Sequence, residues 1–244
     1  MNQHDGPREV SYLSNDYPMA LRDLESPPSV ISIEGHIDFD ARPILGVVGA
    51  RDSSVMAESW LRRYLPSLAH HALIVSGGAR GIDELAHQIA IHENQSTVVV
   101  LPSGLDCPYP PDWAYRKGDV LRNGGALISE YAAGTSVRRW HFEKRNRIIA
   151  ALSDVVLVVE ARRRSGSAIT ARHAGGMGRV VATLPWFPTD PRGELCNDLL
   201  FNGGATLVRN SEDIASLLQS EVQARLVRML RSQKRESLTV PNSL

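Results

Sequence analysis

Short runs of Val, Ile, Leu and Ala recur along the chain, and polar residues do not alternate with apolar ones inside them. Strands of this kind are buried on both faces, which is typical of a parallel sheet covered by helices on each side. The predicted strands are Ile44–Val48, Ala72–Val75, Thr97–Leu101, Ala126–Ser129, Val155–Glu160, Val180–Leu184 and Ala205–Val208. The predicted helices are Ser54–Leu68, Ile82–His92, Arg145–Leu152, Ala168–Met177 and Ser211–Gln219. The sequence therefore predicts an α/β fold with a doubly wound, mostly parallel sheet.

Outside this regular region, which we expect at 41–215, the two ends have a different character. Residues 1–40 form an N-terminal arm in which 1–16 are polar and loose, a short helix lies between Tyr17 and Pro28, and a strand ends at Gly35. Residues 216–244 are expected to form a polar C-terminal helix followed by a disordered tail of ten residues. A chain of 244 residues can bury a large core, so we expect one domain with two extensions.

Composition limits the classes of function. Lys and Arg number 27, as do Asp and Glu, so the net charge is zero and any affinity for nucleic acid must come from local clusters. Cys107 and Cys196 lie far apart, without the spacing of a zinc site, which fits a reducing cytoplasm. The polar start and the absence of a long apolar run predict neither a signal peptide nor a membrane span.

Three turns rich in small residues follow predicted strands, and each contains or adjoins an arginine. They are Gly46–Arg51, Ser76–Asp83 and Arg162–Ser167. A turn that leads from a strand into a helix presents backbone N–H groups at the positive end of the helix dipole, and such a site binds anions. Three of them at one edge of a sheet predict a ligand with several phosphates. Glu160, at the end of a strand, is expected to pair with one of the neighbouring arginines.

The segment Arg138–Arg147 interleaves cations with the aromatic residues Trp140 and Phe142. Cations that neutralise phosphates, beside rings on which unpaired bases can stack, are typical of single-strand binding. The alternative is a solvated basic helix with both rings in the core. Arg145 and Arg147 are predicted near a helix start, where the dipole disfavours cations, and a bound anion would offset that cost.

Catalysis has less support in the sequence. Asp83 and His87 share a helix face and could form an acid–base or metal pair, but a buried structural hydrogen bond is the favoured alternative. The glycine-rich turns carry neither a Walker A lysine nor the full dinucleotide fingerprint. We therefore expect neither a catalytic residue nor a cofactor or metal.

Several motifs, taken in order, resemble the DprA/Smf family. They are Val48–Arg51, Ser76–Asp83 with Ala86 and His87, Ser103–Asp106 with Tyr109 and Pro110, Ser129–Tyr131, Phe142 with Arg145–Ala150, and Glu160–Ala161 with Ser165–Ser167. The resemblance implies an extended Rossmann fold that binds and protects single-stranded DNA, dimerises, and helps load the RecA recombinase during natural transformation or recombination. It carries DNA contacts over to Arg51, Ser76, Gly77, Gly78, Arg80, Gly81, Phe142, Arg145, Arg147, Ser165, Gly166 and Ser167, and more loosely to Arg138 and Arg139.

Two rival functions remain open at the level of sequence. A nucleoside-monophosphate hydrolase of the related LOG group would need a Pro-Gly-Gly-x-Gly-Thr segment, and Arg164–Ala168 stands in the comparable place. A sensor that binds a small nucleotide would use the same turns. The chain also departs from the family pattern at Gly78, Pro102 and Glu143, and the acid at Glu143 lies inside the basic segment.

Overall fold

A single sheet runs through the computed structural model, which describes residues 6–239. Within that range the strand order is β1-β2-β6-β5-β4-β3-β7-β8-β9. The strands are β1 Arg8–Ser11, β2 Val30–Gly35, β3 Ile44–Val48, β4 Leu73–Ser76, β5 Thr97–Val100, β6 Ala126–Ser129, β7 Val155–Val158, β8 Val180–Thr183 and β9 Thr206–Leu207. Every neighbouring pair from β6 to β9 is parallel, whereas β2 pairs antiparallel with both β1 and β6. The predicted α/β fold with a mostly parallel sheet is confirmed.

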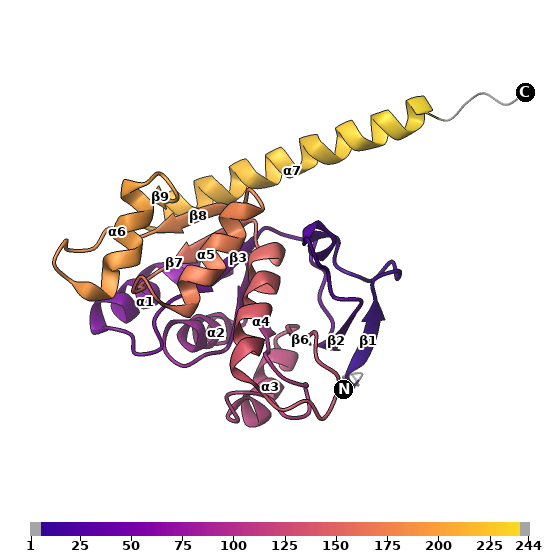
Figure 1. Ribbon diagram of the computed structural model, residues 1–244, viewed down its shortest axis with the longest axis horizontal. Coiled ribbons are helices and arrows are strands. Elements are labelled where there is room, and N and C mark those ends of the chain that lie inside the picture. The colour runs from indigo at the N-terminus through magenta and orange to yellow at the C-terminus, as the bar shows by residue number, and fades with distance from the viewer. Residues whose placement is uncertain (1–5, 240–244) are drawn as a thin grey trace, which may run out of the picture.

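Helices cover the sheet in two groups (Figure 1). Helices α4 and α5 pack together, while α1 packs with α2 and α7. Both α2 and α4 contact β3, β4 and β5 without packing on each other, so the two groups lie on opposite faces. The helices are η1 Met19–Asp23, α1 Val55–Ala69, α2 Ile82–His92, α3 Trp113–Arg122, α4 Arg139–Leu152, α5 Gly166–Gly176, η2 Pro191–Gly193, α6 Glu194–Phe201 and α7 Ser211–Thr239. Within residues 6–239, no helix has the length and apolar character that a membrane crossing needs.

The order of the strands creates a topological switch between β3 and β7. The chain builds outward from β3 through β4, β5 and β6, and then returns to add β7, β8 and β9 on the other side. In doubly wound sheets a crevice forms where the strand order reverses, outside the carboxyl ends of the strands, and ligands bind there. The turns after β3 and β7 meet at that crevice.

The N-terminal arm differs from the prediction of a loose segment at 1–16. Strand β1 pairs with β2 over four residues, and only Val10 of β1 is buried. An edge strand with a single buried side chain carries almost no alternating pattern, which is why the sequence did not reveal it. Residues 1–5 lie outside the described residues.

Two helices also differ from the prediction. Helix α4 begins at Arg139, so the prediction that Arg145 and Arg147 lie near a helix start was wrong. They lie in its second and third turns, where the helix dipole does not disfavour cations in particular. Helix α7 runs unbroken from Ser211 across the expected boundary at 215/216 and includes residues 235–239, which were expected to be disordered. Its C-terminal part projects beyond the body of the molecule (Figure 1). The side chain of Asn210, not that of Ser211, accepts a hydrogen bond from the first turn.

Helices α3 and α6 were not predicted. The sequence of α3 shows little helical periodicity. This helix follows Pro110 and Pro111, contains Gly118, and buries only Trp113, Val120 and Leu121. The carbonyl group of Gly78 accepts a hydrogen bond of 2.8 Å from the Trp113 indole, which ties α3 to the second glycine turn.

Candidate functional site

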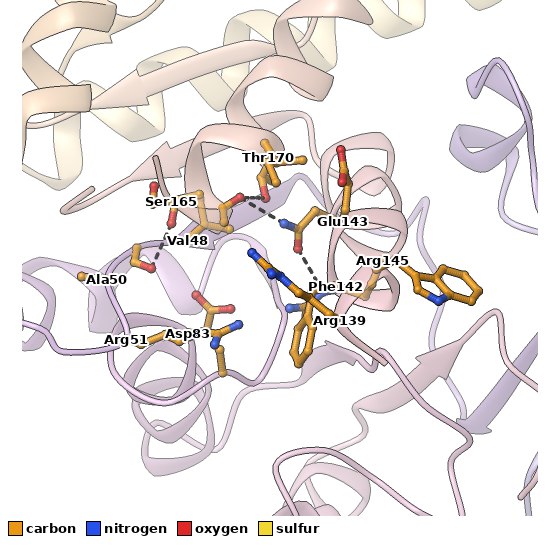
Figure 2. A pocket seen from close by; sticks show the side chains of 17 residues that line it. Val48, Ala50, Arg51, Asp83, Arg139, Phe142, Glu143, Arg145, Ser165 and Thr170 are labelled. Atoms are coloured by element: carbon orange, nitrogen blue, oxygen red, sulfur yellow. Dashed lines mark hydrogen bonds between the residues drawn. The ribbon is translucent and has the colours of Figure 1, made fainter. Parts of the chain in front are cut away.

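The three predicted turns come together at the carboxyl ends of β3, β4 and β7. Ser167 Oγ, from the third turn, donates to the Gly49 carbonyl of the first over 2.9 Å. The Ile82 N–H, from the second turn, donates to the Ala50 carbonyl of the first over 3.1 Å. With residues of α4 these turns surround a cavity of about 890 Å³, which we call the main cavity (Figure 2). Among the predicted site residues, its lining includes Arg51, Arg139, Phe142, Arg145, Ser165, Gly166 and Ser167.

One wall of the main cavity is the first turn of α5. Ser165 has an extended backbone and caps the helix, because its Oγ accepts the Ala168 N–H over 3.3 Å. Asn146 Nδ2, from α4, donates to the Gly166 carbonyl over 3.0 Å and fixes this turn against α4. The N–H groups of a first helical turn have no partner within the helix. They lie at the positive end of the helix dipole, so this wall suits an anion.

Two positions in the second turn must be glycine, because other groups of the protein lie close to their backbone. A Cβ on Gly77 would lie 1.8 Å from Arg145 Nη1, and one on Gly81 would lie 2.3 Å from the Ala50 carbonyl oxygen. Gly81 also has a φ of 81°, in the left-handed region that a side chain disfavours. The turn can therefore lie against Arg145 and the first turn only because no side chain intervenes.

Arg145 forms the floor between the turns. It is 4% exposed, and its Nη1 donates to the carbonyl groups of Gly77 and of Val100, the latter over 2.7 Å. Its Nε donates to Asn146 Oδ1 over 3.1 Å, while Nη2 has no partner among the described residues. Burial lowers the pKa of Arg145 to about 10, so the guanidinium stays charged at neutral pH. Part of this cation is thus committed to structure, and Nη2 is the nitrogen left for a ligand.

The Asp83 carboxylate lies beside this cation, at the edge of the main cavity. It accepts the Gly77 N–H over 3.2 Å and is 6% exposed. Burial raises the pKa of Asp83, and the nearby Arg145 opposes that rise. His87 is held separately, with its Nδ1 2.8 Å from Thr97 Oγ1. Each residue has its own structural partner, so the structural alternative for the Asp83–His87 pair fits and the acid–base pair does not form.

Opposite the α5 wall, an arginine and an aromatic ring are paired at the surface. The Arg51 guanidinium carbon lies 5.0 Å from the centre of the Phe142 ring, and Tyr109 meets Phe142 edge to face with centroids 5.5 Å apart. Figure 2 shows Arg51, Phe142 and Arg145 around the same opening. Trp140, on the rim, is 51% exposed, and its side chain packs on Tyr131. The alternative that buries both aromatic rings in the core is therefore wrong.

Some predicted residues lie away from the main cavity. Gly77 and Arg80 line a second cavity on the other side of Phe142. Ser76 is fully buried and donates to the Val47 carbonyl, while Gly78 and Gly81 shape the turn. Arg138 is exposed just before α4.

Arg147 points to different partners. It pairs with Glu130, whose side chain is 4% exposed, and donates to the Ser26 carbonyl over 2.8 Å. The structure therefore does not bring Arg147 together with Arg51 and Arg145.

The prediction that Glu160 pairs with a neighbouring arginine is wrong. Glu160 is 1% exposed and accepts from the Ser54 N–H and hydroxyl, over 3.0 and 2.5 Å. Ser54 caps α1, so this carboxylate positions the helix after the first turn. In the third turn Arg163 pairs with Asp198, and Arg162 and Arg164 are exposed without lining the main cavity.

Tyr109 and Asn146 are site residues to which the sequence analysis assigned no contact with a ligand, although both stand in the family motifs. A tyrosine among prolines and an asparagine within a basic helix carry no local pattern that points to a site. Their positions follow only from how α4 and the loop before α3 fold over the turns. Within residues 6–239, no three His, Cys, Asp or Glu side chains gather closely enough to hold a metal ion.

Comparison with known proteins points to one family. The chain is 39% identical to Protein Smf of Escherichia coli over 219 residues, covering 89% of this chain and 57% of that protein. It is 35% identical to DNA processing protein DprA of Streptococcus pneumoniae, covering 84% of this chain and 72% of that protein. A Synechocystis Protein Smf is 35% identical and is covered over 55% of its length. The chain thus spans between about half and three quarters of the length of these relatives.

Solved structures agree. The X-ray structure of Streptococcus pneumoniae DprA matches with a TM-score of 0.79 at 34% identity, over 86% of this chain and 73% of that one. Helicobacter pylori DNA processing protein A, whose single-stranded DNA binding mode has been described, matches with a TM-score of 0.77 at 28% identity, over 88% and 96%. The family model for DNA recombination-mediator protein A matches residues 8–219, and the chain belongs to this DprA/Smf family.

Proposed function

We propose that this protein binds single-stranded DNA across the carboxyl edge of its sheet. The observation that carries the proposal is the composition of the main cavity. One wall offers the N–H groups and hydroxyls of the α5 turn, and the other offers Arg51 against the Phe142 ring. This arrangement matches a ligand that alternates phosphates with flat rings.

Phosphates are placed on the α5 side of the cavity. Ser165 supplies its hydroxyl beside the helix N-terminus, and Ser167 supplies its backbone N–H, because the Ser167 hydroxyl already donates to the Gly49 carbonyl. The exposed Arg51 and Arg139 supply charge from the rim. The chain is neutral overall, so its attraction for DNA is local and short in range. Two acids, the exposed Glu143 and the buried Asp83, also line the cavity, so a bound strand must pass Glu143 on the rim.

Bases are placed against Phe142, with Trp140 as a second ring on the rim. A base can stack on a side chain only when it has left its own helix, so these rings favour single strands over duplex DNA. Stacking uses the face common to all bases, and we expect binding that tolerates any sequence. The relative from Helicobacter pylori, which is described with single-stranded DNA, supports this assignment through shared family and fold.

We also propose that the protein protects exposed single strands and helps load RecA, in natural transformation or recombination. The same proposal places it in the cytoplasm as a homodimer. The relative from Streptococcus pneumoniae is named DNA processing protein DprA, which supports a role on DNA, and we propose that this role is binding without turnover. For the dimer we favour the end of the sheet at β9, where Phe201 is 91% exposed and Leu207 is 45% exposed.

Fluorescence anisotropy tests the central claim. A labelled single-stranded oligonucleotide of about 20 bases and the matching duplex are titrated with protein over a salt series. We expect preference for the single strand and an affinity that falls steeply with salt. Binding of mononucleotides with no binding of either DNA at low salt would instead support the nucleotide sensor. Phosphate release from mononucleotides would support the hydrolase.

A further inference from the structure

A loop that the proposed site does not use lies at the same edge of the sheet. It covers residues 184–190 and leads from β8 to η2. Strand β8 pairs in parallel with β7, so this loop leaves the carboxyl edge one strand beyond the third turn. The Leu195 N–H donates to the Ala161 carbonyl over 3.0 Å, which ties the segment after the loop to the start of that turn. The loop therefore continues the edge that carries the candidate DNA site.

One aromatic ring projects from this loop. Phe187 is 72% exposed, whereas its neighbour Trp186 is 6% exposed. A single exposed apolar side chain on a mobile loop would need no explanation. Phe187 differs from that case, because the backbone on both sides of it is fixed to the rest of the protein.

The two fixed points are Trp186 and the turn that follows Phe187. The Trp186 indole donates to the Val159 carbonyl, directly after β7, over 3.0 Å. The Asp190 N–H donates to the Phe187 carbonyl over 2.9 Å and closes a turn in which Pro188 is the second residue. A backbone held in this way has little conformational entropy left to lose, so the exposed ring is preorganised for a ligand.

Positive charge lies beside the same turn. Arg192 donates to Asp190 from its side chain and its backbone N–H, and these bonds together with the nearby Arg162 lower the pKa of that carboxyl to about 2. Arg162 is exposed and forms no ion pair within residues 6–239. A flat ring next to an unpaired cation suits a base and its phosphate. A purely apolar protein partner would leave the charge of Arg162 unmatched.

We propose that Phe187 is a further stacking position for single-stranded DNA. A base of a strand bound in the main cavity stacks on this ring, and Arg162 contacts a neighbouring phosphate. The inference rests on the proposed function, because it extends the path of the same strand from the crevice between β3 and β7 to the turn after β8. Trp186 is a positioning residue, which keeps the loop in place without touching the base.

Strands of different length test the proposal. Single-stranded oligonucleotides shortened stepwise from about 20 bases are titrated by anisotropy against the unaltered protein, Phe187→Ala, Phe187→Tyr and Tyr115→Ala. Tyr115 on α3 is 89% exposed and lines neither cavity, so it is the matched control for the loss of an exposed ring. Loss of one stacked base weakens binding by roughly 5- to 150-fold.

We expect Phe187→Ala to show that loss on the longest strand. On the shortest strands that still bind, Phe187→Ala should match the unaltered protein, because those strands fill only the main cavity. Phe187→Tyr and Tyr115→Ala should match it at every length. A long strand without bases offers nothing to stack, so Phe187→Ala should bind that strand as tightly as the unaltered protein does.

The possible failures are distinguishable. Full affinity of Phe187→Ala for the longest strand, or an equal loss at all lengths, would overturn the stacking position and leave the proposed function standing. A change of molecular mass in Phe187→Ala by light scattering would assign the ring to a contact between copies and would also overturn it. If the unaltered protein binds no single strand at low salt, the proposed function itself fails. Matching thermal unfolding curves would show that each variant is folded.

Discussion

Arg145 and Arg51 lie at one site and have different roles. Arg145 is buried and donates to two strand-end carbonyl groups, so removing it would leave Gly77 and Val100 without a partner and Asp83 without a nearby cation. A loss of DNA affinity in such a variant would not distinguish a lost DNA contact from a lower stability of the fold. Arg51 is exposed and rests on Phe142, which makes it the cleaner probe of phosphate contact.

Arg51→Ala should weaken binding to single strands of any sequence. One lost phosphate contact lowers the slope of log affinity against log salt by about 0.7. The measurement is anisotropy over a salt series, with Arg63→Ala on α1 as the control, since Arg63 is exposed and lines neither cavity. An unchanged slope and affinity for Arg51→Ala would remove Arg51 from the phosphate site.

We expect His87 to make the free energy of unfolding depend on pH. Burial, and to a lesser degree the Arg145 cation, lowers the pKa of His87 to about 3. The unfolded chain takes up this proton near pH 6.5 and the folded chain does not, so the stabilisation is complete above pH 6.5 and is lost as the pH falls toward 3. The slope is about 1.4 kcal/mol per pH unit at most.

Urea unfolding between pH 7 and pH 4 tests this expectation. His87→Gln cannot titrate, so its free energy of unfolding should depend less on pH than that of the unaltered protein. His71→Gln, at an exposed position, should keep the full dependence. Parallel pH profiles for His87→Gln and the unaltered protein would contradict the assignment.

At the scale of elements, the site depends on how closely the turns approach each other. Helix α5 supplies its N-terminus, α4 supplies Arg145 and Phe142, and the second turn fits between them without side chains. Ser54 and Glu160 add a further link, because a buried carboxylate at the end of β7 holds the N-cap of α1. The geometry of the cavity is therefore a property of several elements together.

Gly81→Ala should destabilise the protein by more than 1 kcal/mol, because its left-handed φ and the Ala50 carbonyl at 2.3 Å both oppose a Cβ. Gly176→Ala is the matched change in open space near the end of α5, where alanine favours the helix by up to about 1 kcal/mol. Denaturant unfolding measures both variants. Equal stability of the two would show that the close approach at Gly81 is not needed.

At the scale of the whole molecule, the sheet has two different ends. The β1 end is a short antiparallel extension, whereas the β9 end is a two-residue strand that carries the exposed Leu207 and follows α6, whose last residue Phe201 is also exposed. An exposed sheet edge next to apolar side chains favours pairing with a second copy. The candidate DNA site lies between these ends, at the switch point.

Leu207→Glu should shift a dimer toward monomer, because a charge would be placed at the proposed contact. Light scattering after size-exclusion chromatography, over a range of protein concentrations, gives the mass directly. Leu13→Glu, at a position 86% exposed near β1, serves as the control. A dimer that persists in Leu207→Glu would place the interface elsewhere.

The sequence by itself determined the class of fold and the position of the three turns. Buried parallel strands must be apolar throughout, and a strand that turns tightly into a helix must end in small residues, so both features are local and readable. Helix Ile82–His92 was predicted to the residue for this reason. The family motifs are likewise runs of neighbouring residues, which is why the resemblance to the DprA/Smf family could be recognised and then confirmed.

Only the tertiary structure decided which side chains share a space. Arg145 and Arg147 are two residues apart, yet one faces the glycine turn and the other pairs with Glu130. Glu160 and Ser54 meet across 106 residues, and Tyr109, from a loop with no periodic signal, meets Phe142 of α4. Contacts of this kind depend on how helices and loops pack over the sheet edge, and that packing is a sum of many distant contacts that no short stretch of sequence encodes.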